Sequence, residues 1–419
     1  MQKKSLNSDG KRNKAQQRVK ELGNQIEAYL LQRDQIPDGI TYWSSVEEAQ
    51  ERLMNWFGIS EHLWNNWEWQ MKHRITEVST LTQLIQISRQ QEKDVAEVSR
   101  FYRFAISPYY LSLVCNEEKK CPIRNQAVPL IEEIEDTSGT LDPMAEDEGS
   151  PVQSVVQRYP DRVIIIVTNC CAMYCRHCQR RRKIIQTDSH ITSEALRSAL
   201  DYVKQNKQIR DVLLTGGDAL MLSDDKLDWL LTELEQIPHV EIKRIGTRVP
   251  VTLPMRITDR LCQILSRHLP LYVNTQFNHP LEITPVSAEA CLKLARSGIA
   301  LGNQSVLLAG INDNAHVIKK LNQMLLKIMV RPYYLFHAKP IKGTSHFRTP
   351  IETGLNIIKE SRGSTSGLAI PTFVINAPGG LGKIALNYEC VVGEIGNSVI
   401  LKTWEGKLIQ YENPSPTVK

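Results

Sequence analysis

The sequence has no long apolar segment. Its longest aliphatic run, Val163-Ile-Ile-Ile-Val167, is far shorter than the roughly 20 residues that a membrane-spanning helix needs. The basic start, Met1-Gln-Lys-Lys4, precedes no apolar stretch of the kind that a secretory signal requires. The net charge of +5 on 419 residues is too small and too spread out to indicate binding to nucleic acid. We therefore expect a cytoplasmic protein that binds neither a membrane nor nucleic acid.

The paired C-x₂-C motifs of structural zinc sites are also lacking. Four of the nine cysteines lie together, in Cys171-Ala-Met-Tyr-Cys175-Arg-His-Cys178 and at Cys170 beside it. Three thiolates at C-x₃-C-x₂-C spacing can hold three irons of a [4Fe–4S] cluster, and in radical chemistry the open fourth iron usually binds S-adenosylmethionine (SAM). Zinc would want a fourth ligand, usually from a second pair. The pattern predicts a cluster on Cys171, Cys175 and Cys178, and a pairing of Cys170 with Cys175 stays open.

The first 150 residues form one region of mixed character. Residues 1–35 are polar and predict a solvated tail that runs into a helix, and Ser45–Arg100 has helical apolar spacing. The segment Trp64-Asn-Asn-Trp67-Glu-Trp69 predicts a packing ridge rather than a cofactor site. The acidic segment Ile131–Gly149 is interpreted as an exposed connector, and we place a domain boundary near Ser150.

After residue 150, short β-branched runs alternate with longer amphipathic segments. This alternation is typical of βαβ units, and right-handed crossovers would curl six such units into an open, partial (β/α)₆ barrel of the α/β class. We expect an N-terminal helical region (1–150), the partial barrel (151–363) and a C-terminal segment (364–419). The predicted strands are Arg162–Thr168, Asp211–Leu214, Glu241–Gly246, Leu271–Thr275, Ile299–Leu301 and Met329–Leu335, and the predicted helices are Thr192–Asn206, Asp225–Gln236, Thr258–Arg267, Ser287–Arg296 and Ala315–Ile328. The C-terminal segment predicts a strand at Thr372–Ile375 and a hairpin-like pair around Trp404-Glu-Gly406.

Polar motifs follow several of these strands. The cysteine run follows the first, Leu214-Thr-Gly-Gly-Asp218 the second, Gly302-Asn-Gln304-Ser the fifth, and Phe336-His-Ala-Lys339 the sixth. Parallel α/β folds build their sites at the carboxyl ends of strands, so we expect these motifs to meet there. Gly-Gly-Asp alone is a weak signal that is more often a simple turn.

A glycine-rich stretch, Asn376-Ala-Pro-Gly-Gly-Leu-Gly-Lys383, lies near the end of the chain. It lacks the spacing of a nucleotide-binding P-loop, and Ile384 stands where that motif has Ser or Thr. Backbone N–H groups at such a turn, with a lysine at its end, suit pyridoxal phosphate (PLP) held as a Schiff base. The alternative is an exposed loop with a solvated lysine.

Taken together, the ordered motifs resemble the lysine 2,3-aminomutase family, whose members are radical-SAM, PLP-dependent isomerases. The resemblance covers roughly Trp64 to Tyr411 and rests on the cysteine run and on Arg158-Tyr-Pro-Asp-Arg162, Thr275-Gln-Phe-Asn-His-Pro280, Gly302-Asn-Gln-Ser305, Arg331-Pro-Tyr-Tyr334, His346-Phe-Arg-Thr-Pro350 and Ala377-Pro-Gly-Gly-Leu-Gly-Lys383. It implies that Lys383 carries PLP, that Arg158 and Arg162 lie near the cofactor phosphate, and that Arg180 takes the substrate α-carboxylate. It also implies a SAM pocket lined by Gly216, Gly217, Asp218, His177 and Gln304.

Two departures from the lysine enzymes concern the substrate. Those enzymes hold the distal ammonium of lysine with two aspartates, and this chain has Lys339 and Asn376 at the corresponding positions. A lysine substrate would meet a like charge, which at ~4 Å costs roughly 1–4 kcal/mol with water-like to surface-like screening. A glutamate substrate would gain an ion pair and an amide donor. The resemblance is therefore to the glutamate 2,3-aminomutase branch, with L-glutamate as substrate and L-β-glutamate as product.

Other interpretations stay open. The substrate could be lysine or another amino acid if Lys339 points outward and Asn376 merely caps a turn, and a non-catalytic iron–sulfur electron carrier or sensor would have no use for the PLP loop. The end Pro-Ser-Pro-Thr-Val-Lys419 and Asn314 lack the cysteines of the family's structural zinc, so we expect none. Phe336 and Gln276 replace an expected tyrosine and histidine. The resemblance further implies an electron donor such as flavodoxin or ferredoxin and a homo-oligomer.

Overall fold

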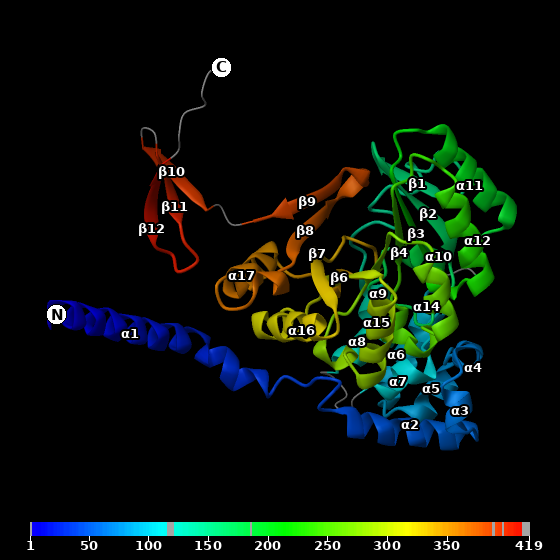
Figure 1. Ribbon diagram of the computed structural model, residues 1–419. Helices are drawn as coiled ribbons and strands as arrows, with labels where there is room; N and C mark the ends of the chain where they lie inside the picture. The colour runs from blue at the N-terminus through cyan, green and yellow to red at the C-terminus, as the bar shows by residue number, and fades with distance from the viewer. Residues whose placement is uncertain (1, 115–120, 185–186, 388–389, 396–397, 413–419) are drawn as a thin grey trace.

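The computed structural model describes residues 2–114, 121–184, 187–387, 390–395 and 398–412. A nine-stranded sheet in chain order, β1 to β9, forms its centre (Figure 1). Strands β2 to β8 are parallel, and the edge strands β1 and β9 pair antiparallel with their neighbours. The strands are β1 (Val155–Tyr159), β2 (Arg162–Thr168), β3 (Asp211–Gly216), β4 (Ile242–Gly246), β5 (Leu271–Thr275), β6 (Ala300–Leu307), β7 (Val330–His337), β8 (Thr372–Ala377) and β9 (Gly382–Leu386). The predicted partial barrel is confirmed.

Amphipathic helices connect the parallel strands. In α11, Leu196, Ala199, Leu200 and Val203 are buried, the i, i+3, i+4, i+7 spacing that places apolar side chains on one helix face. The connecting helices are α10 (Arg181–Ile184), α11 (Ser193–Gln205), α12 (Asp224–Glu235), α13 (Val249–Thr252), α14 (Asp259–Ser266), α15 (Pro285–Arg296), α16 (Ala315–Lys327) and α17 (Ile351–Ser361). Side-chain oxygens accept backbone N–H groups at the start of five of them, at Thr192, Ser223, Thr258, Thr284 and Asn314.

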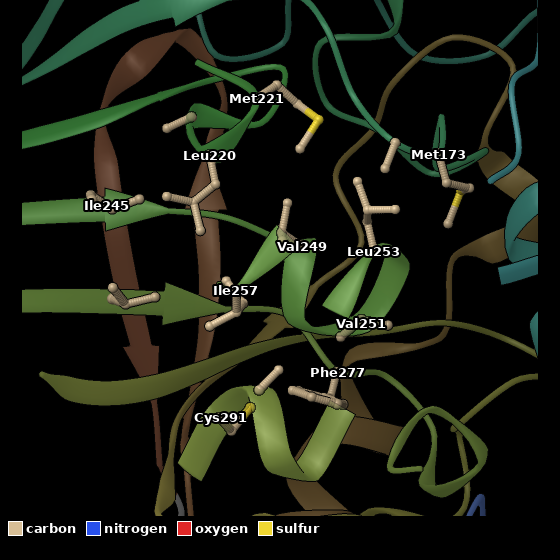
Figure 2. Close-up of a cluster of buried hydrophobic side chains, with 14 of the residues drawn as sticks. Met173, Leu220, Met221, Ile245, Val249, Val251, Leu253, Ile257, Phe277 and Cys291 are labelled. Carbon is tan, nitrogen blue, oxygen red and sulfur yellow. The ribbon is translucent and has the colours of Figure 1, made fainter. Parts of the chain in front are cut away.

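The hydrophobic core anchors the cysteine loop. Met173, between Cys171 and Cys175, is 3% exposed and belongs to the main core cluster. Figure 2 draws it in one cluster with buried side chains from several elements, among them Ile245 of β4, Val249 of α13 and Phe277. This burial fixes the middle of the loop that carries the three cysteines.

The region before the barrel is helical. Its helices are α1 (Gln2–Arg33), α2 (Trp43–Phe57), α3 (Glu61–Trp64), α4 (Trp67–Lys72), α5 (Val78–Leu84), α6 (Arg89–Ser99), α7 (Pro108–Ser112), α8 (Pro122–Ala127) and α9 (Glu132–Glu135). Trp64 is buried in the core, and Trp67 and Trp69 pack against it, so the predicted packing ridge is confirmed. α1 extends away from the barrel (Figure 1).

A small antiparallel sheet follows β9. It consists of β10 (Val391–Ile395), β11 (Ser398–Lys402) and β12 (Leu408–Glu412), and the turn between the last two contains Trp404-Glu-Gly406, as predicted. Gly406 has φ +81°, a left-handed conformation that suits glycine in such a turn. Arg18 of α1 pairs with Glu405 at 2.6 Å, which joins the first helix to this sheet.

The interpretation of Ile131–Gly149 as an exposed connector is wrong. Glu133 and Glu146 are 1% and 2% exposed, and Met144 is 2% exposed. Acidic composition suggested a solvated segment, but these carboxylates pair with Arg176, within the cysteine run, and Arg180, just after it, more than thirty residues later in the chain. Burial of a charge requires such a partner, and the partners are set by the tertiary fold.

Candidate active site

A cavity of about 490 Å³ lies at the carboxyl ends of the parallel strands, and the cysteine loop after β2 forms one wall. The thiols of Cys171, Cys175 and Cys178 all border it. Burial raises the pKa of Cys171 well above its usual value and that of Cys178 to about 11. Thiolates in this position would need nearby positive charge, which cluster irons supply. In the described ranges, no three His, Cys, Asp or Glu side chains are arranged to hold a metal ion among themselves.

The glycine pair after β3 lets the cysteine loop approach closely. Gly216 has φ +143°, and a Cβ there would lie 2.2 Å from the Thr168 carbonyl oxygen. A Cβ on Gly217 would lie 2.5 Å from the carbonyl carbon of Asn169. Only glycine fits at this contact, so the pair lets the turn at the end of β3 lie against the loop that carries the thiols.

Asp218 borders the cavity, but its carboxylate already has partners. Its oxygens accept hydrogen bonds from the Thr247 hydroxyl and the Arg248 backbone N–H, each at 2.6 Å. It therefore ties the turn after β3 to the turn after β4, a structural link that the Gly-Gly-Asp motif alone did not reveal.

The other residues assigned to the SAM pocket also border this cavity. His177 is buried and its Nε2 lies 3.0 Å from the Gln276 Nε2, while Gln304 and Phe336 contribute from β6 and β7. Burial lowers the pKa of His177 well below its usual value, so its ring is neutral. The structure thus brings all five predicted SAM-pocket residues together.

Arg180, two residues after Cys178, is held by Glu146. Its Nε and Nη2 donate to the two Glu146 oxygens at 3.0 and 2.9 Å, and its Nη1 donates to the Gly216 carbonyl at 3.2 Å. Burial raises the pKa of Glu146, but the charges of Arg180 and Arg158 outweigh burial and hold that pKa below its ordinary value. Glu146 was not predicted as a site residue, because the acidic residues around it suggested an exposed segment.

Glu133 makes a second buried pairing beside the loop. Arg176 donates to both of its oxygens, at 2.9 and 2.6 Å, and Arg181 also donates to it. Together with Glu146, it holds three of the arginines at and after the cysteine run. The acidic segment before the barrel therefore supports the cysteine loop, which forms a wall of the site.

Lys339 follows β7 and also borders the cavity. Its Nζ donates to the Oε1 of Gln179, on the cysteine loop. Burial, and then the charge of Arg180, lower the pKa of Lys339 to about 7. Lys339 thus points into the site next to the predicted carboxylate-binding arginine.

Lys383 and Asn376 lie opposite each other on β9 and β8. The Lys383 backbone N–H donates to the Tyr159 hydroxyl at 2.9 Å, and its Nζ is 5.6 and 5.7 Å from the ring centroids of Tyr159 and Tyr334. Lys383 is exposed overall, but partial desolvation of the amine, and then the charges of Arg244, Arg162 and Arg158, lower its pKa to about 8.

The groups around Lys383 fit a phosphate-bearing cofactor. The Nε and Nη2 of Arg158 are buried without a hydrogen-bond acceptor, although Nη2 lies 3.4 Å from Glu146. Arg162 stacks on Tyr159 at 4.2 Å. Hydrogen-bond donors without an acceptor, and positive charge, thus lie around the Lys383 amine. Such groups suit a cofactor that has an anionic phosphate and an aldehyde. Lys383, Asn376, Arg158 and Arg162 do not border the 490 Å³ cavity, but Lys339 interacts electrostatically with both Arg180 and Lys383 and so connects the two parts.

A partial parallel barrel with three thiols around a cavity at its carboxyl end defines a radical SAM protein. Comparison with known proteins agrees: the radical SAM superfamily model matches residues 165–321, and the lysine-2,3-aminomutase model matches residues 358–419. This superfamily implies SAM and a [4Fe–4S] cluster as cofactors. No helix in the described ranges has the length and apolarity to cross a membrane.

Curated relatives narrow the identification. The chain is 47% identical over 404 residues to the glutamate 2,3-aminomutase of Clostridioides difficile (strain 630), covering 96% of each chain. It is 48% identical over 357 residues to the L-lysine 2,3-aminomutase of Acetoanaerobium sticklandii and 46% identical to that of Clostridium subterminale, covering 85% of this chain and 86% of each relative. The chain belongs to the lysine 2,3-aminomutase family and is an isomerase. Family membership disfavours the alternative of a non-catalytic electron carrier or sensor.

Removal of Glu133 tests the buried pairing. In Glu133→Ala, Arg176 and Arg181 lose a carboxylate that no solvent replaces, so we expect the free energy of unfolding to fall by about 3–5 kcal/mol, measured by urea denaturation. The exposed neighbour Glu132 provides a matched control, because Glu132→Ala should change that free energy by less than about 0.5 kcal/mol. Equal effects of the two substitutions would contradict the assignment.

Proposed function

We propose that the chain is a glutamate 2,3-aminomutase, which interconverts L-glutamate and L-β-glutamate. The observation that carries this proposal is the charge at the distal end of the site: Lys339 points into the cavity and forms no salt bridge with any described residue. A substrate with a distal carboxylate supplies the missing negative charge, whereas the ammonium of lysine would be repelled. The 47% identity to a glutamate 2,3-aminomutase supports the same choice.

Cofactor positions follow from the residues described above. Cys171, Cys175 and Cys178 would hold the cluster, Gly216, Gly217, Asp218, His177 and Gln304 would border SAM, and Lys383, Arg158 and Arg162 would hold PLP. When bound, the cluster and SAM supply a carbon radical, and PLP supplies a conjugated system attached to the migrating nitrogen. The chain itself binds and orients the substrate and excludes water from the radical.

Arg180 and Lys339 would hold the two ends of the substrate. Glu146 uses the Nε and one Nη2 proton of Arg180, and Gly216 uses one Nη1 proton. A guanidinium has five N–H donors, so one on each Nη remains for the substrate α-carboxylate. With Lys339 and Asn376 on the distal carboxylate, both ends are fixed and one C–H bond is presented to the radical.

Five further assignments belong to this proposal. We place the protein in the cytoplasm, where cluster-binding thiols stay reduced, with flavodoxin or ferredoxin as the electron donor and a homo-oligomer as the assembly. We retain the three-part division at residues 150 and 363. Structural zinc is not expected.

The second candidate, an aminomutase acting on lysine or another amino acid, rests on the several L-lysine 2,3-aminomutases of 45–48% identity.

Lys383→Ala tests the cofactor assignment. The variant should lose the visible absorbance band of bound PLP and all amino migration, because no amine remains to bind the aldehyde. Iron content should be unchanged, since Lys383 does not border the cavity that the three cysteines line. Amino migration by this variant without an added amine would exclude Lys383 as the attachment point.

The pH dependence of kcat/KM tests the role of Lys339. Its ammonium is charged below its pKa of about 7 and neutral above, with Arg180, Arg158, Lys383 and Glu146 as the charged groups around it. We expect kcat/KM for L-glutamate to fall above pH 7. Well above that pH, each further pH unit should lower it by about tenfold. The fall should be absent for L-norvaline, which has a methyl group in place of the distal carboxylate. Lys339→Arg should abolish the fall, because a guanidinium stays protonated; a wild-type profile in that variant would contradict the assignment.

A further inference from the structure

Two cations that border the cavity, Arg180 and Lys339, have different partners. Arg180 has its own buried carboxylate, Glu146. Lys339 donates instead to a neutral carboxamide, that of Gln179, and its Nζ lies 5.5 Å from the Phe336 ring centroid. The charge of Arg180 is thus compensated within the protein, and that of Lys339 is left for a ligand.

Gln179 occupies a particular place in the loop. It stands between the last cysteine, Cys178, and Arg180, and it borders the same cavity. A carboxamide offers one acceptor oxygen and two N–H donors. Since the Oε1 of Gln179 accepts from Lys339, the group that remains for a substrate is the Nε2, a donor.

We infer that Gln179 is a specificity-determining residue that binds the distal carboxylate of the substrate through its Nε2, beside the Lys339 ammonium. This inference rests on the proposed function and extends it by one residue. An acidic side chain at 179 would pair with Lys339 and cancel the charge that attracts the carboxylate, whereas an amide leaves that charge in place and adds a donor. The lowered pKa of Lys339, caused first by burial and then by the charge of Arg180, is consistent with an ammonium that forms no salt bridge with a described carboxylate.

The discriminating measurement is the ratio of kcat/KM for L-glutamate to kcat/KM for L-norvaline. In Gln179→Met, which keeps the side-chain length and removes the amide, this ratio should fall about tenfold or more, the factor that one hydrogen bond to a charged group supplies. In Gln179→Glu, which keeps the shape and adds a negative charge, it should fall further. General damage to the loop would lower both values and leave their ratio unchanged.

Gln276→Met provides the matched control. Gln276 borders the same cavity, but its amide contacts His177 rather than Lys339, so the ratio should stay at its wild-type value. Iron content and the cluster absorbance show whether each variant retains its loop. If Gln179→Met loses the cluster, Gln179→Asn, which keeps the amide but withdraws it by one methylene, is compared in the same way and should also lower the ratio.

The outcomes separate the inference from the function on which it rests. A wild-type ratio in a cluster-containing Gln179→Met enzyme, or in Gln179→Asn where that variant replaces it, overturns the role of Gln179. A wild-type enzyme that does not prefer L-glutamate to L-norvaline overturns the proposed function itself. A reduced ratio in Gln179→Met together with an unchanged ratio in Gln276→Met supports the inference.

Discussion

Two buried carboxylates, Glu133 and Glu146, determine the shape of the site. Each takes charged arginine side chains out of water, which is stable only because the ion pairs are short and bear several hydrogen bonds. The arginines lie at and directly after the cysteine run, so these pairs fix the loop that carries the thiols. They also explain why an acidic segment outside the barrel is buried. The region before the barrel therefore supports the active-site loop through these two carboxylates.

The same pairs set the charge balance of the cavity. Glu146 contacts Arg180 at 2.9 Å and lies 3.4 Å from Arg158, so it stands between the predicted substrate-binding and phosphate-binding arginines. Lys339 has no equivalent carboxylate in the part of the chain that the structure describes. Under the proposed function, an amino acid with two carboxylates would complete this arrangement, with one carboxylate on the free donors of Arg180 and the other beside Lys339. In this proposal, substrate selection depends on which cation the protein leaves without a carboxylate partner.

Much of this could be predicted from local sequence. The boundaries of β2 and β5 match their predictions because β-branched runs end sharply at turn residues, and the C-x₃-C-x₂-C spacing identifies the thiols directly. Edge strands β1 and β9 were missed because they are short and partly exposed. The partners of Asp218, Glu146 and Lys339 were also missed, since each lies on a distant part of the chain. The sequence shows which residues carry charge, but only the fold shows which charges meet.

The central claim is that the uncompensated lysine selects a distal carboxylate. Its most direct test is product analysis after anaerobic reconstitution with iron, sulfide, PLP, SAM and a reductant, with L-glutamate and L-lysine offered together at equal concentration. We expect β-glutamate as the product, with no β-lysine. Formation of β-lysine would contradict the claim, because a lysine substrate would have to place its ammonium beside Lys339.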